Sequence, residues 1–208
     1  NAESGFWFWF ARLTAAAFVF IAGVSLWLAL QSKTEGDILR RAAKIFCLGL
    51  AITIVTWLVI PRGFVVFGVL HCIGLSLAFA VPLVKLKSIR LALLGLIVVV
   101  AGVVLNGLTF DFPWLLWLGF APAGFATIDY FPLAPWFGVF LLGAAFAKSF
   151  YAARKPIESK NVALQGLACL GRHSLAVYLL HQPALLAVLL AAGARPANVN
   201  LFGLFGGF

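Results

Sequence analysis

Apolar runs long enough to cross a membrane restrict the fold of this chain more than any other feature. A spanning helix needs about 20 mostly apolar residues, and the sequence contains about six such windows joined by short loops. Hydrophobic residues make up 64% of the 208 residues and charged residues only 10%, too few polar side chains to cover a soluble domain. The sequence therefore predicts an all-α integral membrane protein with about six transmembrane helices, folded as one polytopic domain over residues 1–208.

The predicted spans can be placed from their polar and proline boundaries. Pro61 ends the second span because proline cannot continue the hydrogen-bond ladder of a helix. Between residues 109 and 135, prolines, aspartates and tryptophans interrupt an apolar segment, which predicts an interfacial cap on the bilayer surface. No role is predicted for the tail, residues 193–208. The six spans are residues 6–30, 42–60, 64–84, 91–108, 136–151 and a segment that contains 171–183 and ends near 192.

The net charge of +9 comes from cations that gather in alternate loops. Such a bias marks the cytoplasmic loops of a membrane protein, so it predicts a topology and no nucleic-acid partner. The cap and the N-terminus then face the extracytoplasmic side. An outward N-terminus has to be carried across by a preceding segment, and the chain starts at Asn1 without any methionine. We therefore expect one further helix upstream in the full protein. The loop cations are Lys33, Arg40, Arg41, Lys44, Lys85, Lys87, Arg90, Lys148, Arg154, Lys155 and Lys160.

Several common kinds of site have no counterpart in the sequence. Cys47, Cys72 and Cys169 have no CxxC spacing, so we interpret them as small apolar side chains and predict no disulfide framework and no metal site. A Gly-rich phosphate loop and a Ser-His-Asp order are also missing. These absences exclude the common soluble enzyme classes.

Two of the three histidines lie in the stretch from Gly171 to Pro183. Polar groups inside a membrane helix are costly and call for a reason. Ser174, Tyr178 and His181 follow i, i+4, i+7 spacing and share one helix face. They line a polar path into the membrane, or they hold two helices together by hydrogen bonds.

Three further polar residues allow two interpretations each. His71 is predicted near the centre of the third span, where a neutral imidazole suits a general base but also a structural hydrogen bond to a neighbouring helix. Arg12 lies about 9 Å inside the first span, so it snorkels outward or binds a ligand inside the bundle. Asp129 binds an amino group or pairs with Arg12, or it is a turn former or helix cap.

Four segments, in this order, resemble the prokaryotic branch of the heparan-alpha-glucosaminide N-acetyltransferase catalytic-domain family. They extend the similarity from about residue 5 to about residue 190, but the family's first helix, with its Arg-Gly pair and a histidine, has no counterpart, so this chain alone is expected to be an incomplete catalyst. The segments are Arg12 with FIAGVSL (20–26), GVLHCIGLS (68–76), DYFPLAPWFGV (129–139) and LGRHSLAVYLLHQP (170–183).

The resemblance implies a bacterial cytoplasmic (inner) membrane acyltransferase that takes an acetyl or similar acyl group from cytoplasmic acetyl-CoA. The acceptor is an amino sugar or a related extracytoplasmic molecule. The alternative is a non-catalytic subunit of a larger membrane complex; a homo-oligomer is also compatible with the sequence. A transporter ranks last, because the chain has no visible inverted repeat.

Under this resemblance each polar residue receives a predicted role. Arg172 and His173 stand at the cytoplasmic mouth and would contact the phosphates of acetyl-CoA, although such cations also simply set topology. The predicted catalytic residues are His71, His181 and Asp129; the cofactor-binding residues are Arg172, His173, Arg40 and Arg41; the substrate or conduit residues are Arg12, Tyr178 and Ser174.

Overall fold

The computed structural model describes residues 5–59, 63–110 and 114–152, and the single residues Gly171, Val177, Val188 and Ala191. The chain divides into two compact units, residues 1–153 with 205–208, and residues 154–204. All the helices described below belong to the first unit. Apart from the four single residues, the predicted sixth span and the tail lie outside the described residues.

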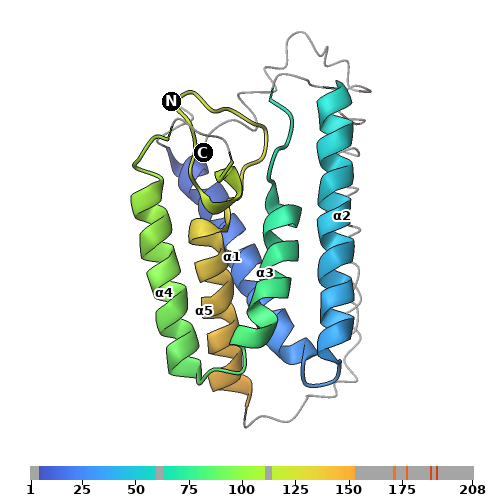
Figure 1. Cartoon of the computed structure of the whole chain (residues 1–208), viewed down its shortest axis with the longest axis vertical. Coiled ribbons are helices and arrows are strands. Elements are labelled where there is room, and N and C mark those ends of the chain that lie inside the picture. Colours follow the sequence, from blue (N-terminus) through green and yellow to red (C-terminus); the bar gives the residue numbers. More distant parts are fainter. Residues whose placement is uncertain are drawn as a thin grey trace. The chain divides into compact units, whose positions relative to one another are not determined.

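The first unit is helical, with five α-helices and one short 3-10 helix along its described residues (Figure 1). Three of them, α1, α4 and α5, are long and apolar enough to cross a membrane, and α3 is a shorter apolar helix. The predicted all-α membrane class is confirmed, while the count of about six spans stays a prediction. In order, the elements are α1 (Phe6–Ala29), α2 (Glu35–Val59), α3 (Val69–Leu83), α4 (Ser88–Leu105), η1 (Leu116–Leu118) and α5 (Leu133–Tyr151).

Every α-helix after α1 starts at a residue other than the predicted one, and the starts of α2 and α3 differ most. Helix α2 begins at Glu35, well before residue 42, because Thr34 and Asp37 cap it reciprocally. The Thr34 N–H donates to Asp37 Oδ2 over 3.1 Å, and the Asp37 N–H donates to Thr34 Oγ1 over 3.2 Å, as in a capping box. Helix α3 begins at Val69 instead of residue 64. The apolar residues before it are not helical.

Glycines bring α1 and α4 into close contact with α5. A Cβ on Gly23 would collide with the Phe140 carbonyl of α5, and a Cβ on Gly143 with the Phe20 carbonyl of α1. Gly95 of α4 and Gly138 of α5 face each other's carbonyls in the same way. Small residues are the usual means by which membrane helices approach closely. These contacts make α1, α4 and α5 one packed group.

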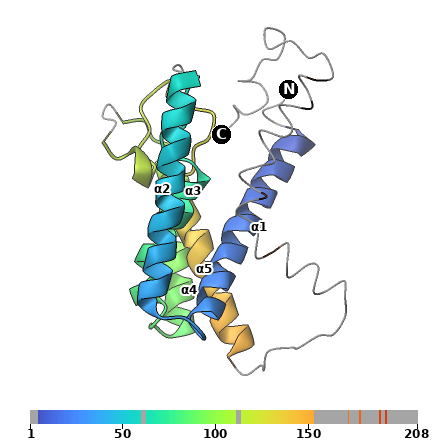
Figure 2. The same ribbon diagram turned by 90° about the vertical axis from the view of Figure 1, so that its right-hand side faces the viewer.

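Helix α3 connects this group to α2. Helix α2 packs on α3, and α3 also contacts α5 and α1. Figure 2 shows α1 and α2 close at the turn that joins them and diverging toward the N-terminal end of α1. Helix α3 therefore lies between α2 and the group of α1, α4 and α5. Both ends of α3 contact residues from distant parts of the chain.

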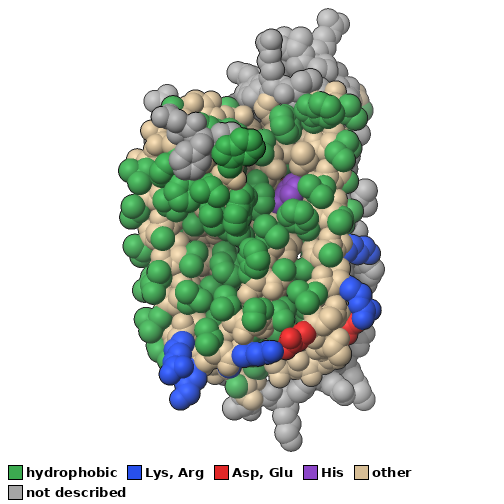
Figure 3. Space-filling view, viewed as in Figure 1, with side chains coloured by type: hydrophobic (Ala, Val, Ile, Leu, Met, Phe, Trp, Pro, Cys, Tyr) green, Lys and Arg blue, Asp and Glu red, His purple; other side chains and the backbone are tan. Residues whose placement is uncertain are grey.

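The surface of the first unit suits a lipid bilayer. Hydrophobic side chains cover most of the face in Figure 3, and the Lys and Arg side chains gather in its lower half. Water penalises so much exposed apolar surface, whereas a lipid bilayer does not. The outward face of α4 shows the pattern most clearly, with the exposed side chains of Ile89, Leu93, Leu96, Ile97, Val100 and Val103.

Candidate functional site

Two segments far apart in sequence pair beside the start of α3. Phe67 and Tyr130 form a parallel β-bridge, and the Phe131 N–H donates to the Phe67 carbonyl over 2.9 Å. Nearer the start of both segments, the Ile128 N–H donates to the Gly63 carbonyl over 3.0 Å. This pairing keeps residues 63–68 out of a helix and sets Asp129 over the first residues of α3.

Asp129 caps the N-terminus of α3. Its Oδ2 accepts a hydrogen bond from the Val69 N–H over 3.1 Å, one of the amides that a helix start leaves without a partner. Gly68 makes room for the carboxylate, because a Cβ there would collide with Oδ2. The other oxygen, Oδ1, accepts no hydrogen bond from the residues that the structure describes. Of the predicted interpretations of Asp129, the structure therefore shows the helix cap. Oδ1 remains available to a ligand.

The carboxyl of Asp129 has an unusual acidity for an aspartate. Burial raises its pKa to about 6, and the hydrogen bond from the Val69 N–H opposes this rise. Burial has the larger effect of the two, and it acts by removing the water that stabilises the charged form. Arg12, the predicted pairing partner, is partly buried on α1 with its guanidinium carbon 4.7 Å from the centroid of the Phe8 ring. The structure shows a cation–π contact for Arg12.

His71 occupies the first turn of α3, so its predicted position near the middle of a span is wrong. The error follows from the later start of the helix at Val69. His71 Nδ1 accepts a hydrogen bond from the Gly68 N–H over 3.3 Å, and Nε2 lies 3.5 Å from Thr53 Oγ1 on α2. The side chain is almost fully enclosed, with 2% of the residue exposed.

Helix α2 shapes the space around the imidazole. A Cβ on Gly49 would lie 3.0 Å from His71 Cε1, so the glycine leaves room for the flat ring. The rings of Phe46 and Phe67 lie with their centroids 5.3 Å and 5.4 Å from that of the imidazole. Sequence analysis missed Gly49 and Thr53. Their signal is the i, i+3, i+7 spacing of Phe46, Gly49 and Thr53, which puts them on one face of α2.

The hydrogen bonds of His71 assign its neutral tautomer. Since Nδ1 accepts the Gly68 N–H, the proton of a neutral ring is on Nε2. In this state His71 donates a hydrogen bond through Nε2 and has no free nitrogen to accept a proton. The general-base role suits Asp129 better, because a pKa of about 6 lies near the pH at which a base has to work.

The opposite end of α3 is stabilised by a cation. Lys148, in the last turn of α5, donates from Nζ to the carbonyls of Val84 and Leu86 over 2.7 Å each. Carbonyls at a helix C-terminus lack partners within the helix and attract positive charge. Sequence analysis placed Lys148 only among the loop cations. Its contact joins two helices distant in the chain, which no local pattern reveals.

A cavity of about 450 Å³ opens beside this end of α3. Nearby, Lys85 Nζ forms an ion pair with Glu35 Oε1 at 2.8 Å. The cavity lies between the turn that joins α1 to α2, the end of α3 and the last turn of α5. Its lining residues are Trp27, Leu30, Gln31, Lys33, Thr34, Glu35, Val81, Val84, Lys85 and Lys148.

The predicted site residues do not all come together. Asp129 and His71 meet at the start of α3, bound to the adjacent N–H groups of Val69 and Gly68. Arg40 and Arg41 are exposed on α2 and do not line the cavity; Arg40 lies 3.6 Å from Asp37. The remaining predictions, Arg172, His173, Ser174, Tyr178 and His181, lie outside the described residues.

The apolar helices and the polar groups at both ends of α3 define a multi-pass helical membrane protein. The family model for heparan-alpha-glucosaminide N-acetyltransferase, catalytic, matches residues 1–183, and the chain belongs to this family. The predicted resemblance is thereby confirmed, and membership implies an acetyltransferase-like function in the membrane. No curated protein and no solved structure gave a match.

Proposed function

We propose that the protein transfers an acetyl or similar acyl group from cytoplasmic acyl-CoA to an amino sugar or related extracytoplasmic acceptor. The observation that carries the proposal is the match of the catalytic family model to residues 1–183. The gathering of Lys and Arg in the lower half of the face drawn in Figure 3 supports a cytoplasmic donor side there, following the usual charge bias of membrane proteins. A bacterial cytoplasmic membrane is the location that fits the resemblance.

Asp129 and His71 are the described residues best suited to the acceptor. Asp129 Oδ1 would bind the amino group and take the proton that the nitrogen loses as it attacks the acyl carbon. His71 Nε2–H would donate a hydrogen bond to the oxygen on which negative charge develops. Acetyl-CoA supplies an acyl group activated as a thioester. As the C–N bond forms, the C–S bond breaks, and CoA leaves as a thiolate that takes up a proton to give free CoA. Because His71 is enclosed, the acceptor reaches it only when a neighbouring side chain moves.

The proposal is tested by incubating purified full-length protein with radiolabelled acetyl-CoA and a panel of amino sugars. We expect label to pass to at least one amino sugar. In the Asp129→Asn variant the amide oxygen still accepts the Val69 N–H, but proton transfer is lost, and we expect a rate reduced at least about 100-fold. Asp37→Asn is the matched control, because Asp37 also caps a helix, α2, and should leave the rate unchanged. Absence of transfer to every acceptor would contradict the proposal.

A non-catalytic subunit is the second candidate, and the environment of His71 favours it. Both ring nitrogens have partners at Gly68 and Thr53, so the residue serves the fold whether or not a reaction occurs. Native mass spectrometry of gently solubilised membranes separates the candidates. A subunit should appear in a larger assembly, whereas an isolated monomer or homodimer would argue against this role.

A further inference from the structure

The cavity at the C-terminal end of α3 has the size of a small-molecule site. Its volume of about 450 Å³ is within the usual range for ligand pockets. Trp27, Leu30, Val81 and Val84 form an apolar side, and Gln31, Lys33, Thr34, Glu35, Lys85 and Lys148 supply polar groups. A ligand that fills it therefore carries both an apolar part and a polar part.

The charges of the lining favour an anion. Three lysines and one glutamate line the cavity, so the formal charge is positive. Lys148 donates to two carbonyls, which leaves one of the three donors of its ammonium group for a ligand. These carbonyls also hold the ammonium group in place before any ligand arrives. The cavity thus contains a fixed cation at the end of α3.

The ion pair between Lys85 and Glu35 is easily exchanged. Their side chains are 67% and 51% exposed, and exposed pairs contribute little to stability. An incoming anion can replace Glu35 as the partner of Lys85 at small cost. Glu35 is then a competitor that lowers the affinity of the cavity for anions.

Among anionic groups, phosphate fits these residues best. Lysine binds phosphate as a compact point charge. Lys33 reaches the cavity from the α1–α2 connection, Lys85 from the α3–α4 connection and Lys148 from α5. We propose that this cavity binds the phosphate group of an amphiphilic ligand, with Lys33, Lys85 and Lys148 as its cationic partners. An acyl-CoA and an anionic phospholipid share this chemistry. For an acyl-CoA the inference rests on the proposed function; for a lipid it stands without it.

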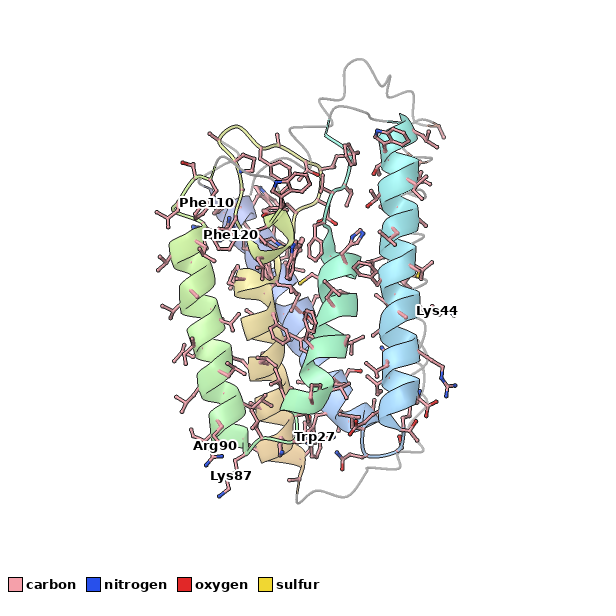
Figure 4. The ribbon with its side chains drawn as sticks, viewed as in Figure 1. Trp27, Lys44, Lys87, Arg90, Phe110 and Phe120 are labelled. Carbon is pink, nitrogen blue, oxygen red and sulfur yellow. The ribbon has the colours of Figure 1, made fainter. Side chains whose placement is uncertain are left out.

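The test measures binding alone, so that it does not depend on turnover. The full-length protein in lipid nanodiscs is titrated with radiolabelled CoA, and phosphatidylglycerol retained after detergent extraction is counted by native mass spectrometry. The cavity variant is Lys33→Gln/Lys85→Gln. Its matched control is Lys87→Gln/Arg90→Gln, which removes the same charge from residues that extend away from the lower end of α4 (Figure 4) and do not line the cavity.

We expect the cavity variant to lose at least about tenfold in affinity for one of the two ligands, because it lacks two charge-assisted contacts. The control should stay near wild type. Glu35→Gln should strengthen binding, while Asp37→Asn, outside the cavity, should not. A loss confined to CoA identifies a cofactor site, and a loss confined to phosphatidylglycerol identifies a lipid site.

Two outcomes overturn the inference: wild-type protein that binds neither ligand, and a cavity variant that binds both as the control does. The second outcome overturns the inference without bearing on acyl transfer, which the amino-sugar assay measures separately. A wild-type protein that binds its ligand in the cavity but transfers no acyl group would instead contradict the proposed function alone. Because Lys33 and Lys85 are exposed, their replacement should leave folding intact.

Discussion

The two ends of α3 solve one physical problem in different ways. Both expose backbone groups that a helix cannot satisfy itself, and at both ends side chains from distant segments satisfy them. At the N-terminal end Asp129 and His71 accept hydrogen bonds from the amides of Val69 and Gly68. This region is closely packed. At the C-terminal end Lys148 donates to carbonyls beside an open cavity. The first end is built for fixed geometry, and the second leaves room for a ligand.

The substitution with the largest expected effect disrupts the packing at the N-terminal end of α3. In Gly68→Ala the new methyl group would occupy the place of the Asp129 carboxylate and lie 2.9 Å from Val65 Cγ1. We expect a loss of about 3 kcal/mol in the free energy of unfolding, because overpacking combines with loss of the cap. Thermal unfolding in detergent micelles measures it. Gly36→Ala is the control, since its methyl group meets only Thr34 Oγ1 at 3.8 Å; equal stability of the two variants would contradict the tight packing of this end.

The next effect concerns the C-terminal end. Lys148→Met removes both hydrogen bonds to the Val84 and Leu86 carbonyls while keeping much of the side-chain volume. We expect a loss of about 2 kcal/mol, the range for bonds to a charged group. Lys44→Met is the control, because Lys44 lies on the outer side of α2 (Figure 4). A Lys148→Met protein with the melting temperature of the control would show that the cap contributes nothing.

How much of this contrast could be predicted depends on distance along the chain. Length and composition predicted the apolar helices. The position of Asp129 in a proline-rich segment made a helix cap one of its predicted alternatives. The start of α3 was wrong because a short apolar run such as residues 64–68 reads equally as strand or helix, and its pairing with residues 127–131 decides the outcome. Lys148 and Thr53 act on other helices, so the sequence alone did not reveal their contacts.

A smaller effect distinguishes the two ends by pH. The folded pKa of Asp129, about 6, exceeds its unfolded value of 3.8. The folded state therefore binds the proton more tightly, and this contribution to stability is complete below the unfolded pKa and is lost as pH rises through about 6. Asp129→Asn retains His71 and every other titrating group, so the comparison of the two proteins isolates the carboxylate. Relative to Asp129→Asn, we expect the melting temperature of the wild-type protein in detergent to fall as pH rises from about 5 to about 7.5. A difference in melting temperature between the two proteins that stays constant over this range would contradict the assignment.

The smallest effect probes the imidazole. Thr53→Val removes the oxygen 3.5 Å from His71 Nε2, a long contact, so we expect a loss of about 0.5 kcal/mol, with Thr53→Ser near wild type. The nitrogen NMR shifts of the His71 ring should show the proton on Nε2 in the wild-type protein, since Nδ1 accepts the Gly68 N–H. A proton on Nδ1 would overturn the tautomer and with it the donor role of Nε2.

The most direct test of the proposed function is the sidedness of acyl transfer in proteoliposomes with one orientation of the full-length protein. Radiolabelled acetyl-CoA is added to one side and an amino sugar to the other, and then the two are exchanged. We expect transfer only when acetyl-CoA faces the side of Lys33 and Lys85 and the amino sugar faces the side of Asp129. Transfer that requires both molecules on the same side, or none in either arrangement, would contradict it.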